Sequence, residues 1–318
     1  MRTLVLATLL LGRAAAAEPM PKLPPMVAVK EVTATSTFAD KRDAYAAWHA
    51  LAYDMRWDMG EGVLWSAWCE GKPDEGLGET VTITLAEPTQ VDEVQVAAGV
   101  WRSDKLFAAN NKITALEVIA DGKPQTVKPR KKDDWASAPI RAKVTTIAVK
   151  VTAVKKGKMN DSCISGINLM RGGETLAPMI GFDPRPLTAL PGALSAIQDA
   201  LSAPDKKGLE PLVEFPFSNH PADGFFMGDP AAVSVKSWKA LIAACQKWDK
   251  LSDEDREGKA TGCPFAVDVD PDDDRGASVT SVGPGTIVVS FPSHREVVPT
   301  WLLHFADGRW RLQAIDYE

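Results

Sequence analysis

Hydrophobic and polar residues alternate along several segments in the first half of the chain. A period of two places one set of side chains on the buried face of a strand and the other towards solvent. The alternating segments are residues 80–85, 94–98, 116–120 and 147–151. Asp121-Gly122, directly after the third segment, favours a tight hairpin turn. This part of the chain is therefore predicted to form an antiparallel β-sandwich.

The second half of the chain combines helical spacing with later strands. Apolar residues follow a helical period at Leu194, Ile197 and Leu201, and Ser234 is predicted to cap another helix. The side chains buried by that second helix would be Trp238, Leu241, Ile242, Cys245 and Trp248. Strands are expected at residues 265–269, 286–291, 300–305 and 310–315, the last two joined by Asp307-Gly308. Helices followed by a meander predict an α+β fold.

The two halves are framed by segments of a different character. Residues 1–17 have a positive start, a short apolar run and small residues near Ala17, which predicts a cleaved signal peptide. An uncleaved membrane tether is the alternative. The expected organisation is a Pro-rich leader at 18–28, the sandwich at 29–170, a linker at 171–188 and the α+β part at 189–318. The protein is expected to be secreted or periplasmic.

Charge is distributed unevenly between the two halves. The chain has a net charge of −6, and residues 29–170 balance 19 Lys and Arg against 19 Asp and Glu. Residues 171–318 hold 14 basic and 22 acidic residues. Neither half has the basic excess of a nucleic-acid-binding domain, so no nucleic-acid partner is expected. Local basic runs at 128–132 and 155–158 are interpreted as solvated turns, with weak attraction to acidic polysaccharide as the alternative.

Several short motifs in the first half resemble those of a known domain. The motifs are Trp68-Cys69-Glu70-Gly71, Gly76-Leu77-Gly78-Glu79, Asn110-Asn111-Lys112 and Asp161-Ser162-Cys163-Ile164-Ser165-Gly166. Together they resemble the glycan-binding domain associated with secreted NAD glycohydrolases, a relative of discoidin-type, galactose-binding β-sandwiches. Gly166 departs from the acidic residue expected there. The resemblance implies a binding module beside a catalyst, and no NAD glycohydrolase domain follows it here.

Polar and aromatic residues around these motifs are the candidate ligand-binding set. Flat rings with a polar rim suit the faces of sugars. The candidates are Trp57, Trp65, Glu70, Glu79, Trp101, Arg102, Asn110, Asn111 and Asp161. For each tryptophan a core role is the alternative. For Glu70 and Glu79 the alternatives are a glycosidase-type carboxylate pair and a structural role in capping backbone donors.

The four cysteines fit an exported protein in which pairing is the default. Three connectivities exist, and the preferred one keeps each bridge within one domain, as Cys69–Cys163 and Cys245–Cys263. Cys69 and Cys163 both lie in the resembling motifs, so their bridge would tie the recognition loop to the closing strand. A buried thiol at Cys245 is the alternative.

Catalytic and metal-binding patterns are weak. None of His49, His220, His294 and His304 stands at metal-ligand or nucleophile spacing, so no cofactor and no catalytic residue are expected. The alternating acids at 268–274 fail the spacing of a calcium loop. Asp54, Asp58 and Glu61 are a second candidate for a structural calcium site.

The sequence thus predicts a secreted, non-enzymatic protein of the bacterial envelope that binds carbohydrate or a surface glycoconjugate. Residues 301–312 and the element order before them resemble the nuclear transport factor 2-like cone. One alternative is therefore a small-ligand-binding or weakly catalytic cone, using Asp229, His304 and Trp301, with the sandwich as targeting module. A homodimer through this second domain is also considered. The other alternative is a structural envelope protein with a degenerate site.

Overall fold

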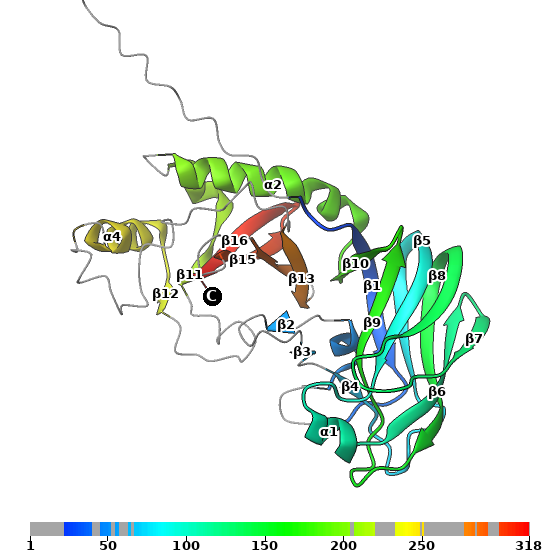
Figure 1. Ribbon diagram of the computed structural model, residues 1–318. Coiled ribbons are helices and arrows are strands. Elements are labelled where there is room, and N and C mark those ends of the chain that lie inside the picture. Colours follow the sequence, from blue (N-terminus) through cyan, green and yellow to red (C-terminus); the bar gives the residue numbers. More distant parts are fainter. Residues whose placement is uncertain are drawn as a thin grey trace, which may run out of the picture.

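The computed structural model describes two sheet-based parts that are joined by a helix and share contacts (Figure 1). It describes residues 22–39, 45–51, 55–56, 63–64, 67–203, 207–219, 233–248, 250, 277–283, 285–291 and 299–317. The predicted signal peptide and most of the leader lie outside these residues. No helix among the described residues is long and apolar enough to cross a membrane.

The first part is an eight-stranded sheet that folds over itself. Its strands are β1 (Met26–Ala34), β4 (Trp68–Cys69), β5 (Thr80–Ala98), β6 (Lys112–Ala120), β7 (Lys123–Val127), β8 (Ala136–Lys155), β9 (Cys163–Arg171) and β10 (Glu174–Ile180). They are ordered β4-β9-β10-β1-β5-β8-β6-β7, with an additional pairing of β9 to β5. The predicted sandwich is therefore present, with longer strands than the sequence indicated.

Strand β5 belongs to both layers of the sandwich. Its first half pairs with β1, its second half pairs with β9, and β8 follows it along both halves. The register shifts between Thr84 and Thr89 and again between Val91 and Glu93. Such irregularities bend a strand and increase its twist, so one strand covers the two segments predicted at 80–85 and 94–98.

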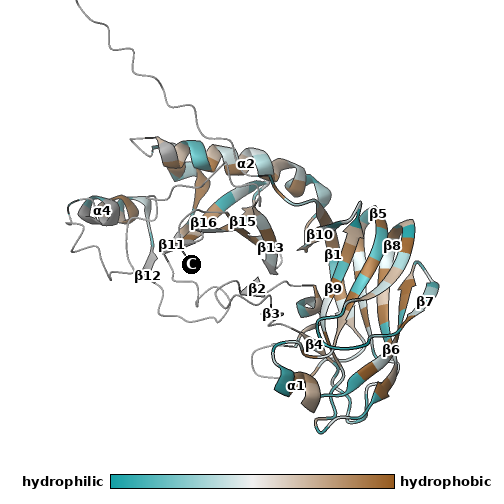
Figure 2. Cartoon of the chain, in the orientation of Figure 1, coloured by the Kyte–Doolittle hydropathy of each residue, from teal (hydrophilic) through white to brown (hydrophobic). Residues whose placement is uncertain are grey.

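Apolar and polar residues alternate along these strands (Figure 2), and the burial of their side chains follows the same alternation. Val81, Ile83 and Leu85 are buried in the main sandwich core, together with the inward residues of β6 and β8. Asp121 and Gly122 have φ of 43° and 79°, the left-handed conformation that a tight β6–β7 turn requires. The Asp121 carboxylate also accepts hydrogen bonds from the Thr145 and Thr146 amides, which secures that turn against β8.

The second part is a six-stranded sheet with a long helix on one face. The helix is α2 (Pro184–Ser202), and the strands are β11 (Val213–Asn219), β12 (Val233–Val235), β13 (Ser278–Gly283), β14 (Thr286–Ser290), β15 (Pro299–Ala306) and β16 (Arg309–Tyr317). Their order is β12-β11-β16-β15-β14-β13. Leu190, Leu194 and Ile197 of α2 pack with Trp301 and Leu303 in one core.

Five short elements complete the sandwich side and the link to the second sheet, and one helix lies beside β12. They are η1 (Ala47–Ala50), β2 (Met55–Arg56), β3 (Val63–Leu64), α1 (Asp104–Ala109), η3 (Lys207–Leu212) and α4 (Trp238–Trp248). The sequence correctly placed the helix at α4, but Ser234 does not cap it because Ser234 lies in β12. Ser237 Oγ accepts the Ala240 amide hydrogen at 3.3 Å in its place. The strand expected at 265–269 lies outside the described residues.

The segment predicted as a linker, residues 171–188, is regular structure instead. Gly172 and Gly173 have positive φ and turn β9 into β10, which then pairs in parallel with β1. Ala177 and Met179 of β10 reach the core of the second part. The Ile180 amide donates to Ser281 Oγ of β13 at 3.2 Å. The two parts are therefore connected through a shared core and through this hydrogen bond from the β10 backbone to β13.

Candidate functional site

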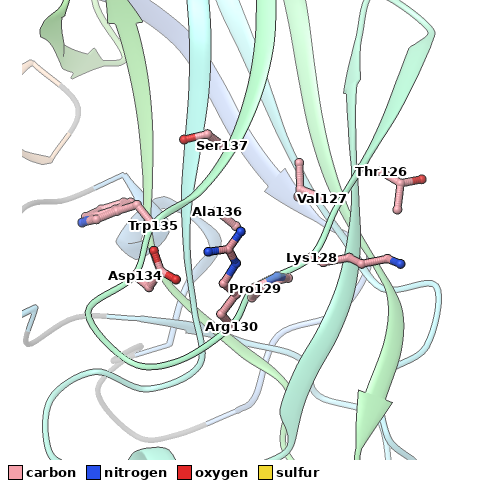
Figure 3. Close-up of a pocket in the computed structure, with 9 residues that line it drawn as sticks. All are labelled: Thr126, Val127, Lys128, Pro129, Arg130, Asp134, Trp135, Ala136 and Ser137. Atoms are coloured by element: carbon pink, nitrogen blue, oxygen red, sulfur yellow. The ribbon is translucent and has the colours of Figure 1, made fainter.

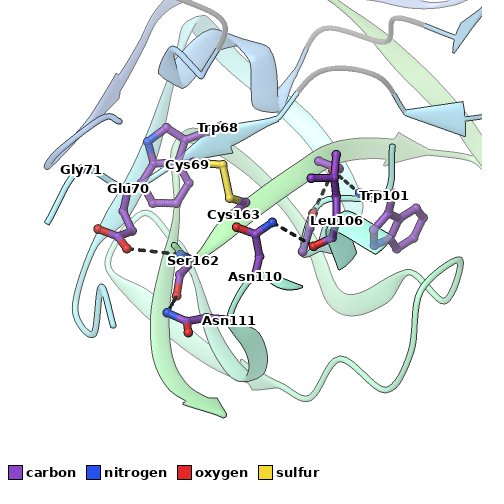
Figure 4. Close-up of a disulfide and its surroundings, with 12 residues drawn as sticks. Trp68, Cys69, Glu70, Gly71, Trp101, Leu106, Asn110, Asn111, Ser162 and Cys163 are labelled. Carbon is purple, nitrogen blue, oxygen red and sulfur yellow. Dashed lines mark hydrogen bonds between the residues drawn. A yellow bond between two sulfur atoms is a disulfide. The ribbon is translucent and has the colours of Figure 1, made fainter. Parts of the chain in front are cut away.

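The disulfide Cys69–Cys163 joins the two segments that carry the family resemblance (Figure 4). Cys69 ends β4 and Cys163 begins β9, and the two are direct cross-strand partners with Cα atoms 4.1 Å apart. Both side chains are buried. The bridge predicted within the sandwich is confirmed. The other predicted pair, Cys245–Cys263, lies outside the side chains that the structure describes.

Glu70 is fully buried beside this disulfide, where its carboxylate binds the backbone of two loops. Its Oε2 accepts the Lys72 amide hydrogen at 2.6 Å, and its Oε1 accepts the Ser162 amide hydrogen at 3.2 Å. Burial raises the pKa of Glu70, and the two amides oppose that rise. The charges of Asp161 and Asp74 raise it further, and burial also raises the pKa of Asp161. These contacts correspond to the structural alternative for Glu70.

Glu79 makes a second connection between loops. Its Oε2 accepts hydrogen bonds from Thr35 Oγ1 at 2.6 Å and from Ser36 Oγ at 2.5 Å. The Ser36 carbonyl in turn accepts the indole N–H of Trp68 at 2.9 Å. Both acidic side chains therefore hold residues 35–36, 70–72 and 162 in place, and their contacts give no support to a glycosidase-type pair.

Glu70 also limits the space at Gly76. Gly76 has φ of +69°, and a Cβ atom added there would lie 2.5 Å from Glu70 Cγ. Gly78 has φ of +87°, but a Cβ there would meet nothing within 4 Å. We expect Gly76→Ala to lower the free energy of unfolding by about 3 kcal/mol, since the clash adds to the backbone strain. The control Gly78→Ala should lose only about 1 kcal/mol from strain. Equal losses in denaturant unfolding would contradict this role of Glu70.

The raised pKa of Glu70 predicts that the free energy of unfolding depends on pH. The folded state binds a proton on the Glu70 carboxylate more tightly than the unfolded chain does. The stability gained in this way is complete below the ordinary pKa of 4.5, and it is lost as the pH rises through the folded-state pKa. Glu70→Gln cannot titrate. Its free energy of unfolding, relative to the wild type, should therefore increase as the pH rises above 4.5 and then level off. Urea unfolding across this range tests the prediction, and a difference that is constant with pH would refute it.

Asn110 and Asn111 are buried and hold the loop that follows α1. Asn110 Nδ2 donates to the Leu106 carbonyl at 2.9 Å, which ends that helix. Asn111 Nδ2 donates to Ser162 Oγ at 3.3 Å, and Asn111 Oδ1 accepts the Gly157 amide hydrogen at 2.9 Å. The structure thus brings the asparagine pair, Glu70 and the disulfide together around Ser162 (Figure 4).

Trp101 is 4% exposed and belongs to a small core, so its ring does not form an open platform. The indole N–H donates to the Ala98 carbonyl at 2.9 Å, and the Trp101 amide donates to Ser165 Oγ at 2.9 Å. Its ring meets that of Trp135 edge to face, with centroids 5.3 Å apart. Trp101 therefore supports Trp135 from the interior. Arg102 is exposed, whereas Trp57 and Trp65 lie outside the described residues.

Trp135 lines an open cleft between the end of β7 and the start of β8 (Figure 3). The cleft has a volume of about 820 Å³. Lys128, Arg130 and Asp134 supply charged groups to it, and Val127 and Ala136 supply apolar surface. Sequence reasoning missed this site, because it placed the basic run at 128–132 on a solvated turn. A signal was available in the close succession of basic residues and a tryptophan.

The second sheet presents a polar cluster that includes one residue of the catalytic alternative. His304 Nδ1 lies 2.8 Å from Glu214 Oε2, which also accepts Gln313 Nε2 at 3.3 Å. Trp301 is buried on the opposite, core face of the sheet, and Asp229 lies outside the described residues. No group of three potential metal ligands occurs in the described part of the chain. Both calcium candidates, at 54–61 and 268–274, fall outside it.

The sandwich is similar to a known family of domains. Residues 26–170 match the family model of the NAD glycohydrolase translocation F5/8 type C domain. This match confirms the resemblance that the sequence motifs indicated for this part of the chain. The match ends before α2, and the nuclear transport factor 2-like interpretation of the second part stays a prediction. No curated protein sequence matches the chain.

Solved structures with similar regions include an enzyme and two binding domains. Arabinofuranosyltransferase AftD from Mycobacteria is 16% identical with a TM-score of 0.36, covering 46% of this chain and 11% of that one. The family 32 CBM of C. perfringens NanJ, in complex with galactose, is 16% identical with a TM-score of 0.31, covering 44% and 91%. The lectin domain of lectinolysin, complexed with Lewis B antigen, is 12% identical with a TM-score of 0.32, covering 45% and 93%. This chain thus spans about a tenth of the length of the arabinofuranosyltransferase.

Proposed function

We propose that this is an exported, non-enzymatic protein that binds carbohydrate in the cleft lined by Trp135. The observation that carries the proposal is the composition of that cleft, in which an aromatic ring adjoins the charged groups of Lys128, Arg130 and Asp134. Sugars need an apolar surface for the ring face together with donors and acceptors for their hydroxyl groups. The F5/8 type C match supports the proposal, because the resembling domain implies a glycan-binding module.

The buried motif residues would contribute to this site indirectly, by positioning the residues that line it. Trp101 packs against Trp135, and Ser165 holds the backbone of Trp101. Glu70 and Asn111 connect the loops around the disulfide, so their contribution to binding is positional. Direct ligand contacts by Arg102 and Asp161 remain part of the proposal.

A glycan array probed with the full chain, with and without calcium, tests the proposal. Trp135→Ala should reduce affinity for the best glycan by about tenfold or more, because stacking on one aromatic ring contributes on the order of 1–2 kcal/mol. Trp48→Ala is the matched control, since Trp48 is also half-buried and packs on the sandwich core away from the cleft. It should leave affinity unchanged per folded molecule. Equal affinities of wild type and Trp135→Ala, or no glycan bound by the wild type, would contradict the proposal.

The second sheet offers a different candidate function. The short contact of His304 with Glu214 favours a small-ligand-binding or weakly catalytic role, because a carboxylate can orient an imidazole for proton transfer. Under this proposal the sandwich is a targeting module. A ligand whose binding is abolished by His304→Ala but unaffected by Trp135→Ala would support it. A structural envelope protein with a degenerate site is the remaining alternative, and it predicts no ligand at either place.

A further inference from the structure

Basic residues continue from the cleft across the surface of the sandwich. Lys128 and Arg130 line the cleft itself. Arg130 and Lys131 line a second, small hollow together with Lys112, and Lys112 is the cross-strand partner of Lys155. The cleft, the hollow and the strand pairing link five basic residues into one continuous surface. We call this surface the basic strip, and it consists of Lys128, Arg130, Lys131, Lys112 and Lys155.

The basic strip is exposed, and its side chains form no ion pairs with their neighbours among the described residues. None of its five side chains forms an ion pair there within 4.0 Å, whereas the neighbouring Lys132 pairs with Asp104 at 3.2 Å and Asp133 at 3.3 Å. Lys112 and Lys155 stand directly opposite each other, an arrangement of like charges that costs stability. An arrangement of this kind is stabilised by an anionic ligand.

We propose that the basic strip and the cleft together bind a polyanionic polysaccharide, an inference that rests on the carbohydrate-binding function proposed above. Trp135 would receive one sugar ring, and the cations would bind the carboxylate or sulfate groups of the following sugars. Arg130 suits this role because its planar guanidinium can bind a carboxylate through two parallel hydrogen bonds.

The acidic surroundings favour a polysaccharide over nucleic acid. Asp134 lies in the cleft, where its carboxylate would repel a phosphate group placed against it. A sugar places neutral hydroxyl groups beside Asp134, which can accept hydrogen bonds from them. A polysaccharide offers such hydroxyl groups on its rings in addition to its acidic groups, and it therefore suits this surface better than a nucleic acid.

The test measures binding of the full chain to polygalacturonate, heparin and neutral dextran. Wild-type affinity for at least one of the two polyanions should fall as salt is raised from roughly 50 to 500 mM. The variant Lys112→Gln/Arg130→Gln/Lys131→Gln should lose about tenfold or more, as expected for three lost charge contacts. Lys30→Gln/Lys123→Gln/Lys143→Gln removes the same charge from exposed positions outside the strip, and it should lose less than about twofold.

Several outcomes would overturn the inference. Equal losses in the two triple variants would show a general charge effect. Single-stranded DNA or phosphatidylserine vesicles that bind more tightly than both polyanions, with the same sensitivity to the strip variant, would assign the strip to another class of partner. Neutral glycans bound by the wild type and lost in Trp135→Ala, with no polyanion bound, would refute the inference and leave the carbohydrate-binding proposal intact. No carbohydrate bound of any kind would refute both.

Discussion

Replacing Cys69 and Cys163 together by alanine is expected to lower the free energy of unfolding by about 4 kcal/mol. The disulfide closes a loop with a sequence separation of 94 residues, which restricts the unfolded chain strongly. Both cysteines are buried among apolar neighbours, so alanine introduces no unpaired polar group. Urea unfolding of the two proteins measures the difference, and a loss under about 1 kcal/mol would contradict the structural importance of the bridge.

Reducing agent supplies the control. Reduced wild-type protein should approach the stability of the reduced Cys69→Ala/Cys163→Ala variant. The variant itself retains Cys245 and Cys263, so any further loss of stability on its reduction reports the second predicted bridge. A variant that reduction leaves unchanged would argue against a Cys245–Cys263 bridge.

Trp101→Ala is expected to lower the free energy of unfolding by about 4 kcal/mol, the cost typical of removing a buried tryptophan. The ring is 4% exposed, contacts Trp135 and donates to the Ala98 carbonyl. The structure therefore favours the core role that the sequence left as an alternative to an exposed platform. Trp101→Phe is the matched control, because it keeps an aromatic ring in the core, and its loss should be clearly smaller.

Thermal and denaturant unfolding, measured beside glycan affinity on the same variants, decide between the two roles of Trp101. Unchanged stability of Trp101→Ala with a large loss of affinity would restore the exposed-platform interpretation. Loss of stability, with a change in affinity per folded molecule clearly smaller than that of Trp135→Ala, supports the core role.

Strands with a regular period were predictable, and the bends within them were not. The alternating segments at 80–85 and 147–151 lie in β5 and β8 as expected. Pro88 and the register shifts around it interrupt the period, so one long strand looked like two. The turns at Asp121-Gly122 and Asp307-Gly308 were found because both residues of each pair adopt positive φ, which these residue types tolerate.

The linker was mispredicted because glycine and proline have more than one structural use. Gly172-Gly173 forms a hairpin turn, and β10 is buried on both faces, so it shows no alternation. Pro184 and Pro186 occupy the first turn of α2, where proline is well tolerated because its missing N–H has no helical partner. The boundary between the two parts consequently lies closer to the start of α2 than to residue 171.

The sequence located the disulfide and the family of the sandwich, whereas the exposure of individual residues required the structure. Glu70, Asn110 and Asn111 are polar, but each is buried and bonded to the backbone. A sequence does not distinguish a buried capping residue from an exposed ligand contact. The cleft depends on how the segment between β7 and β8 packs against Trp101, which no local pattern encodes.

The most direct test of the account is to titrate the isotope-labelled full chain with a glycan found on the array and to follow backbone and indole resonances by NMR. The largest changes are expected on residues 126–137, including the indole N–H of Trp135. Changes confined to the loops around Glu70, Asn111 and Asp161, or to the second sheet near His304, would contradict it.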